Sequence, residues 1–156
     1  MYLSTSSIQS GRQCHKRLWL ELHQPDAADA GDAAQGRFDE GCRFGEIARV
    51  LLGGGALIHA DHLHMDEALL GTAEQLSRPR ESIPQLFELA FSHESVRVRL
   101  DVLQRDVGYD TLIEVKSSSQ VKPEYLWDCA IQAWVARGAG RHVTRVKLLH
   151  VNRVRA

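Results

Sequence analysis

Apolar and polar residues alternate along three stretches between positions 85 and 116, and this pattern constrains the fold more than any other feature of the chain. Alternation with a period of two is typical of β-strands that bury one face. The stretches cover residues 87–91, 96–103 and 112–116, and only short linkers separate them. Because short linkers join antiparallel neighbours, we expect the three strands to form a meander.

Helical periodicity surrounds these strands. Apolar residues recur three or four positions apart on both sides of the meander, and three consecutive glycines end the first of these stretches. A proline after the meander suits the first turn of a further helix. The expected elements are helices at 38–52, 65–76 and 123–137, a short strand at 56–59 and a final strand at 143–152.

Two further helices are expected near the N-terminus, at 4–10 and 12–22, before an Asp-, Ala- and Gly-rich link at 26–36. A chain of 156 residues is long enough for one domain with a real core. We therefore expect a single α/β domain over residues 1–156, with N-terminal helices within 1–35 and a core over 36–152. Its mixed sheet would be flanked by helices.

The charge distribution is uneven. The net charge of −1 argues against strong non-specific binding to nucleic acid, but residues 137–156 hold six Lys or Arg and no acid. A basic tail of this kind either faces phosphates or forms a solvated surface. The candidates for phosphate contacts are Arg137, Arg141, Arg145 and Lys147.

The sequence has no apolar run of the roughly 18–20 residues that a membrane span needs, and its start does not follow the pattern of a signal peptide. We therefore expect a cytoplasmic protein without a membrane partner. Cys14, Cys42 and Cys129 are odd in number and widely spaced, which favours reduced thiols over a disulfide framework.

Four charged residues of the meander are expected to share a face. Side chains alternate across a strand, so Glu114 and Lys116 point the same way, and Asp101 and Glu88 lie opposite the apolar residues of their own strands. Three acids packed beside a lysine repel one another unless a cation resolves the charge. Carboxylate oxygens suit Mg²⁺ or Mn²⁺, and a water activated by such an ion can attack phosphorus.

This arrangement resembles the PD-(D/E)XK nuclease superfamily. The matching segments are residues 98–103, which contain Asp101, and the triplet Glu114-Val115-Lys116. Residues 128–134, with Gln132, and residues 11–20 extend the likeness to the RecB-type branch. That branch includes the CRISPR-associated adaptation nuclease and a family of uncharacterised RecB-like proteins. The resemblance implies a restriction-endonuclease-like core ordered helix, three-stranded meander, helix, strand.

The resemblance also assigns roles. It implies that Asp101 and Glu114 bind the metal with help from the Val115 carbonyl, and that Lys116 is the catalytic lysine. Gln132 would match a glutamine that the branch places beside this lysine. Glu46 would match a metal ligand on the first core helix, and Glu88 would be a supporting acid.

The chain departs from the family pattern at two places. The branch often has a tyrosine four residues after the glutamine, where this chain has Ala136. Iron–sulfur relatives use one early cysteine and three after the core, whereas no cysteine follows Cys129 here. The resemblance therefore implies no iron–sulfur cluster in this chain.

The expected function is a metal-dependent DNA nuclease, with exonuclease and endonuclease modes both open. The alternative is an inactive nuclease-fold module that binds nucleic acid or a protein partner, either alone or within a larger parent protein. A third possibility is a zinc site, against the simpler interpretation of surface histidines; its residues would be His59, Asp61, His62 and His64.

Overall fold

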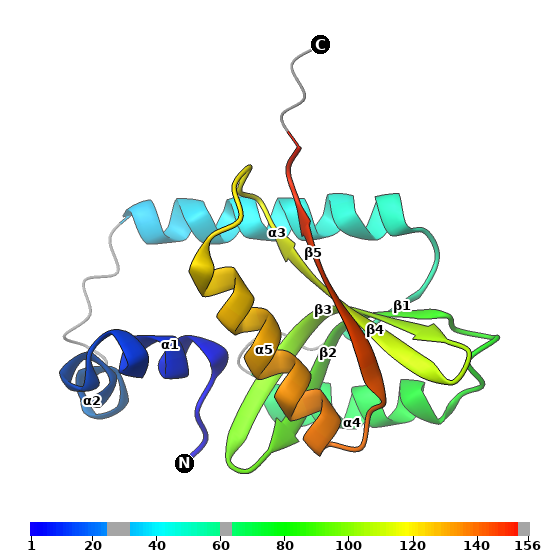
Figure 1. Cartoon of the computed structure of the whole chain (residues 1–156), viewed down its shortest axis with the longest axis horizontal. Coiled ribbons are helices and arrows are strands. Elements are labelled where there is room, and N and C mark those ends of the chain that lie inside the picture. The colour runs from blue at the N-terminus through cyan, green and yellow to red at the C-terminus, as the bar shows by residue number, and fades with distance from the viewer. Residues whose placement is uncertain (25–31, 60–63, 153–156) are drawn as a thin grey trace.

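The computed structural model describes residues 1–24, 32–59 and 64–152, and the side chains from residue 41 onward in the second range (Figure 1). Helices and a five-stranded sheet make up this part of the chain. The helices are α1 (Thr5–Gln13), α2 (His15–His23), α3 (Asp32–Leu52), α4 (Met65–Ser77) and α5 (Pro123–Gly138). The strands are β1 (Ala56–Leu57), β2 (Gln85–His93), β3 (Val96–Asp106), β4 (Tyr109–Lys116) and β5 (Val143–His150).

The sheet is mixed and its strands lie in the order β1-β2-β3-β4-β5. The three central strands pair antiparallel, which confirms the predicted meander. Strand β1 pairs parallel to β2, and β5 pairs parallel to β4. The protein is therefore an α/β protein with a mixed sheet flanked by helices, as the alternation of periods predicted.

Local signals set several of the element boundaries. The Ser4 side chain accepts a hydrogen bond from the Ser7 N–H and caps α1, while Pro123 opens α5. Gly53 ends α3 with a φ of +82°, a conformation that glycine adopts without a steric penalty. Helix α3 begins earlier than predicted, at Asp32, and residues 26–31 of the predicted link lie outside the described part of the chain.

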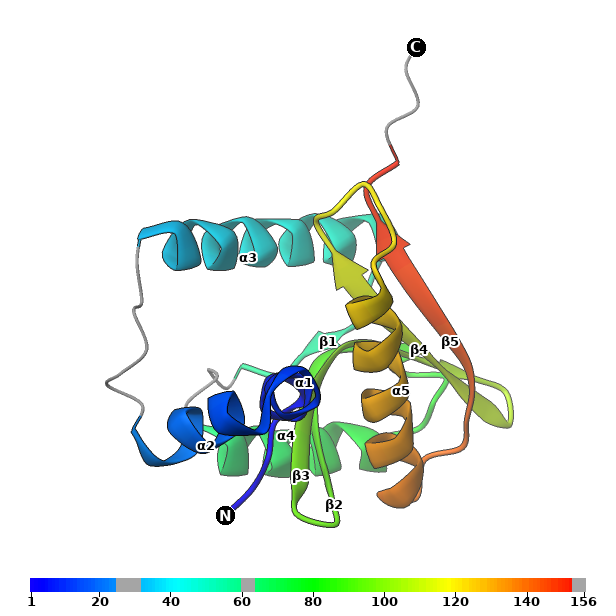
Figure 2. The same cartoon turned by 60° about the vertical axis from the view of Figure 1, so that its left-hand side comes forward.

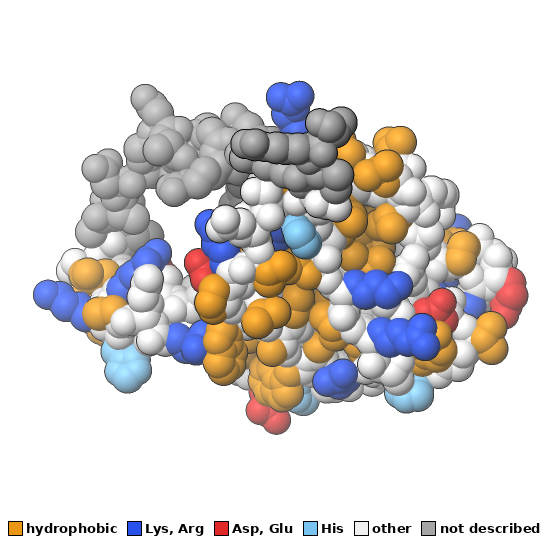
Figure 3. All heavy atoms as spheres, turned by 45° about the horizontal axis from the view of Figure 1, so that its top comes forward, with side chains coloured by type: hydrophobic (Ala, Val, Ile, Leu, Met, Phe, Trp, Pro, Cys, Tyr) orange, Lys and Arg blue, Asp and Glu red, His pale blue; other side chains and the backbone are white. Residues whose placement is uncertain are grey.

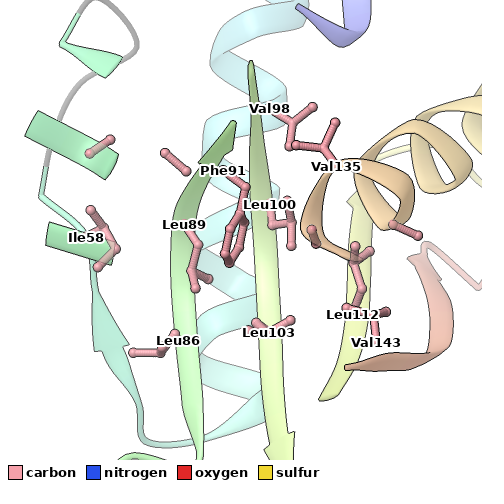
Figure 4. Close-up of a cluster of buried hydrophobic side chains, with 14 of the residues drawn as sticks. Ile58, Leu86, Leu89, Phe91, Val98, Leu100, Leu103, Leu112, Val135 and Val143 are labelled. Carbon is pink, nitrogen blue, oxygen red and sulfur yellow. The ribbon is translucent and has the colours of Figure 1, made fainter. Parts of the chain in front are cut away.

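The helices cover the sheet from several directions. Helix α3 contacts β4 and α4 contacts β2, and the two helices lie on opposite sides of the molecule (Figures 1 and 2). Helix α5 packs across β2, β3 and β5, and α1 lies against α5. Figure 4 shows Val135 of α5 beside Val98 and Leu100 of β3, within the main apolar cluster. Helix α5 is thus held close to the central strands.

Strand β4 is buried on both faces, although its alternation predicted only one buried face. Leu112 belongs to the main cluster around α5. Ile113 points the other way and joins Phe87 and Val102 in a second cluster, to which Leu52 of α3 adds. The prediction was wrong because helices cover both faces of this strand.

No helix within the described ranges is long and apolar enough to cross a membrane.

Candidate active site

Three carboxylates come from three neighbouring strands. Pairing of Phe87 with Val102 and of Leu89 with Leu100 sets Glu88 opposite Asp101. Glu88 has a φ of +59°, which a residue with a side chain rarely adopts and which interrupts regular pairing at this point. Strained backbone of this kind costs about 1–3 kcal/mol and is concentrated at functional sites. The strained residue is therefore one of the three acids, and it lies opposite Asp101.

Asp101 has a carboxylate whose charged form is disfavoured. Burial and the negative charge of Glu114 raise its pKa well above the ordinary value, and the charge of Glu88 adds to the effect. The Val115 N–H donates to Asp101 Oδ2 at 2.6 Å and opposes the rise. A cation placed beside Asp101 would favour the ionised form.

Glu114 and Lys116 lie on the same face of β4, as the sequence predicted. Lys116 Nζ lies 2.7 Å from Glu114 Oε1, and Gln132 Nε2 of α5 donates to Glu114 Oε2 at 2.6 Å. Burial by itself would lower the pKa of Lys116, but Glu114 and Asp128 together raise it above its ordinary value. Lys116 therefore stays protonated at neutral pH and acts as a cation.

Gln132 is buried, with 4% of its surface exposed. Its Nε2 binds Glu114, while its Oε1 has no hydrogen-bond partner among the described residues. A buried amide oxygen without a donor is unfavourable by about 1–3 kcal/mol. The site thus contains one acceptor that a water or another donor can satisfy.

Asp128 is a site residue that sequence reasoning missed. Its Oδ2 lies 2.9 Å from Lys116 Nζ, and its Oδ1 accepts from Gln9 Nε2 at 2.8 Å. The same Gln9 amide donates to the Glu124 carbonyl at 2.7 Å. Asp128 precedes Gln132 by four residues and so shares its helix face, a signal that was available in the sequence. No sequence pattern links it to Gln9, 119 positions away.

Glu88 lies between two arginines. Its Oε1 is 3.6 Å from Arg49 Nη1 of α3, and its Oε2 is 3.7 Å from Arg99 Nη2 of β3. Burial raises its pKa, an effect that both arginines partly offset. Glu46 is exposed on α3, one turn before Arg49, and lines a groove with Arg49 and Phe87. Glu88 therefore lies opposite Asp101 in the sheet but is paired with arginines, whereas Glu46 is exposed and lines a groove that includes neither Asp101 nor Glu114.

The predicted basic surface divides into two parts. Arg137 Nε donates to the Val143 carbonyl, and Arg141 binds the fully buried Asp110 through two contacts at 2.6 and 2.9 Å. These two arginines stabilise the fold. Arg145 and Lys147 are exposed on β5 and face solvent. Lys and Arg side chains lie beside hydrophobic patches on the face drawn in Figure 3.

The described residues contain no group of three or more His, Cys, Asp or Glu side chains that could hold a metal ion in their present arrangement. Of the histidine-rich segment, His59 and His64 are described, whereas Asp61 and His62 lie outside the described residues. Cys14, Cys42 and Cys129 are free thiols, as predicted.

The donors near Asp101 nevertheless suit a hard divalent cation. Asp101 and Glu114 provide carboxylate oxygens, the ligands that Mg²⁺ and Mn²⁺ prefer. Their mutual repulsion is visible in the raised pKa of Asp101. Each oxygen of Glu114 has one protein partner, Lys116 or Gln132, and keeps a second lone pair that can bind an ion. Searches against protein-family models and curated proteins returned no match to this chain.

Proposed function

We propose that the protein is a metal-dependent phosphodiesterase of the PD-(D/E)XK type that cuts DNA. The observation that carries the proposal is the position of Asp101 and Glu114 on neighbouring strands: Asp101 accepts from the Val115 N–H at 2.6 Å, and Glu114 lies 2.7 Å from Lys116 Nζ. The order of the elements supports it. Apart from β1 and α4, which lie between α3 and β2, the order α3, β2-β3-β4, α5, β5 is the core order that the resemblance implies.

Asp101 and Glu114 are the residues that would hold the cation, with the Val115 carbonyl as a third donor. A bound Mg²⁺ or Mn²⁺ would supply positive charge for the phosphate and would lower the pKa of a water. Asp101 is oriented for this role by the Val115 N–H. Gln132 fixes one oxygen of Glu114 and so limits how that carboxylate can turn.

Lys116 has two tasks in this proposal. Its ammonium orients the attacking water and stabilises the negative charge that grows on the phosphate oxygens. Asp128 keeps the ammonium in place and protonated, because it accepts from Lys116 while Gln9 holds its other oxygen. Asp128 is therefore a positioning residue, which acts through Lys116.

A second candidate function is a nuclease-fold module that binds nucleic acid or a protein without cutting. The observation that favours it is that both oxygens of Glu114 already have protein partners, Lys116 Nζ at 2.7 Å and Gln132 Nε2 at 2.6 Å. In such a module these contacts would persist in the presence of Mn²⁺, and no product would form.

Cleavage of labelled single- and double-stranded DNA in Mn²⁺ or in chelator tests the proposal. We expect metal-dependent product from the wild type and a loss of about 100-fold or more in rate from Glu114→Gln. Glu67→Gln, on an exposed part of α4, is the matched control and should cut normally. Equal rates for both variants, or product in chelator, would contradict the proposal.

A further inference from the structure

A groove of about 570 Å³ lies where the N-terminal helices meet α5. Arg12 of α1 and Arg17 of α2 line one side, and Trp127 and Asp128 of α5 line the other. Asp128 also binds Lys116 at 2.9 Å, so the groove adjoins the proposed catalytic site. Its volume is in the range of pockets that bind small organic ligands, which includes a nucleotide.

Arg12 and Trp127 form a stacked pair in this groove. The Arg12 guanidinium carbon lies 3.5 Å from the centre of the Trp127 ring, and 45% of the Trp127 surface is exposed. Arg17 is paired with Glu21, whereas Arg12 has no carboxylate partner among the described residues. The Arg12 N–H donors are therefore held in a fixed plane and remain available to a ligand.

This pair suits an unpaired nucleotide. Bases stack on aromatic rings and on guanidinium planes, and a guanidinium binds phosphate through two parallel hydrogen bonds. A base can reach such a platform only when it is not paired within a duplex. The polar side chains of Ser6 and Gln13, which also line the groove, suit a nucleotide better than an apolar peptide.

We infer that the groove between α1 and α5 binds an unpaired segment of a nucleic-acid strand, with a base on the Arg12–Trp127 pair and a phosphate at Arg12. The inference rests on the proposed function in one respect, that the bound strand leads to Lys116. It assigns single-stranded nucleic acid as the substrate class and makes Arg12 and Trp127 its specificity residues.

Fluorescence anisotropy with a labelled oligothymidylate of about 12 nucleotides, in chelator, tests the inference without any cutting. Arg12→Ala and Trp127→Ala should each weaken binding by about tenfold. Arg12→Ala should also reduce the slope of log K against log salt by about 0.7, since one phosphate contact is lost, while Trp127→Ala leaves the slope unchanged. Arg43→Ala and Trp19→Ala, at exposed positions outside the groove, are the matched controls.

The inference is overturned if the Arg12 and Trp127 variants bind like the wild type, or if a hairpin duplex binds equally well and responds equally to them. It is also overturned if the wild type ignores the oligonucleotide and Trp127→Ala instead abolishes self-association in sedimentation velocity. Because binding is measured without metal, loss of binding in the variants supports the groove even if no DNA is cut. Cleavage that depends on Glu114, with binding unaffected by Arg12 and Trp127, rejects the groove alone.

Discussion

Replacing Asp101 with asparagine should stabilise the protein in the absence of metal. Asparagine keeps the shape of the side chain and an oxygen that can accept from the Val115 N–H, but it removes a charge that burial and Glu114 disfavour. An ionised carboxylate costs several kcal/mol to bury, and a hydrogen bond to it returns about 1.5–3 kcal/mol. A neutral hydrogen bond still contributes about 0.5–1.5 kcal/mol in the variant. The net gain should therefore be about 1–2 kcal/mol.

Bound metal should make the wild type more stable than Asp101→Asn. At this chain length 1 kcal/mol corresponds to about 2–4 °C, so Asp101→Asn should melt about 2–8 °C above the wild type in chelator. An ion at a hundred times its dissociation constant stabilises the wild type by about 2.7 kcal/mol, or about 5–11 °C. The variant lacks one of the two carboxylates and should gain little. With saturating Mn²⁺ the wild type should therefore melt at the higher temperature.

The difference in stability between the wild type and Asp101→Asn should also depend on pH. Unfolded Asp101 loses its proton near pH 3.8, whereas the folded residue keeps it to a higher pH because its pKa is raised. Wild-type stability should thus fall, relative to the variant, as pH rises through this window, and the difference should vanish below it. Differential scanning fluorimetry measures both effects, with Asp66→Asn as an exposed control. A wild type more stable than Asp101→Asn in chelator at neutral pH, or an equal Mn²⁺ shift in both, would refute the reasoning.

Three further predictions concern the surroundings of the site. Asp110→Ala should destabilise the fold by about 3–5 kcal/mol in urea unfolding, because it leaves two arginines around a fully buried position without their carboxylate; a loss under 1 kcal/mol would contradict this. Burial and the nearby acids raise the pKa of Cys129 to about 11, so a thiol reagent at pH 8 should modify the two exposed cysteines and leave Cys129 intact until unfolding. Asp128→Asn should lower the pKa of Lys116 and move the alkaline limb of the cleavage pH profile to lower pH, whereas an unchanged profile would exclude a positioning role.

Much of the sheet could be predicted because its signals are local. The alternation over residues 85–116 fixed three strands, and the period of two placed Glu114 and Lys116 on one face, where they are 2.7 Å apart. The turn lengths then fixed the antiparallel order. The same alternation was wrong about the neighbouring strands. Phe87 and Val102 belong to one apolar cluster, whereas Leu89 and Leu100, two positions along, belong to the other, so the alternation is interrupted at Glu88 and Asp101.

The features that could not be predicted depend on contacts between distant segments of the chain. The burial of β4 on both faces results from the packing of α3 and α5 around it, which a pattern within the strand does not encode. The sequence predicts that Arg141 belongs to a basic surface. In the structure it binds the buried Asp110, 31 positions away, and so stabilises the fold. The contact of Gln9 with Asp128 could not be predicted from the sequence either, because it depends on the packing of α1 on α5.

The most direct test of the account is the rate of DNA cleavage by Lys116→Met compared with Lys122→Met, in Mn²⁺ on substrates labelled at either end. Both lysines approach the ring of Tyr125, at 5.2 and 5.8 Å, but Lys116 alone of the two binds Glu114 and Asp128. We expect Lys116→Met to lose about 100- to 1,000-fold in rate while Lys122→Met keeps wild-type activity. If wild type and Lys116→Met cut at the same rate, this site does not perform the chemistry.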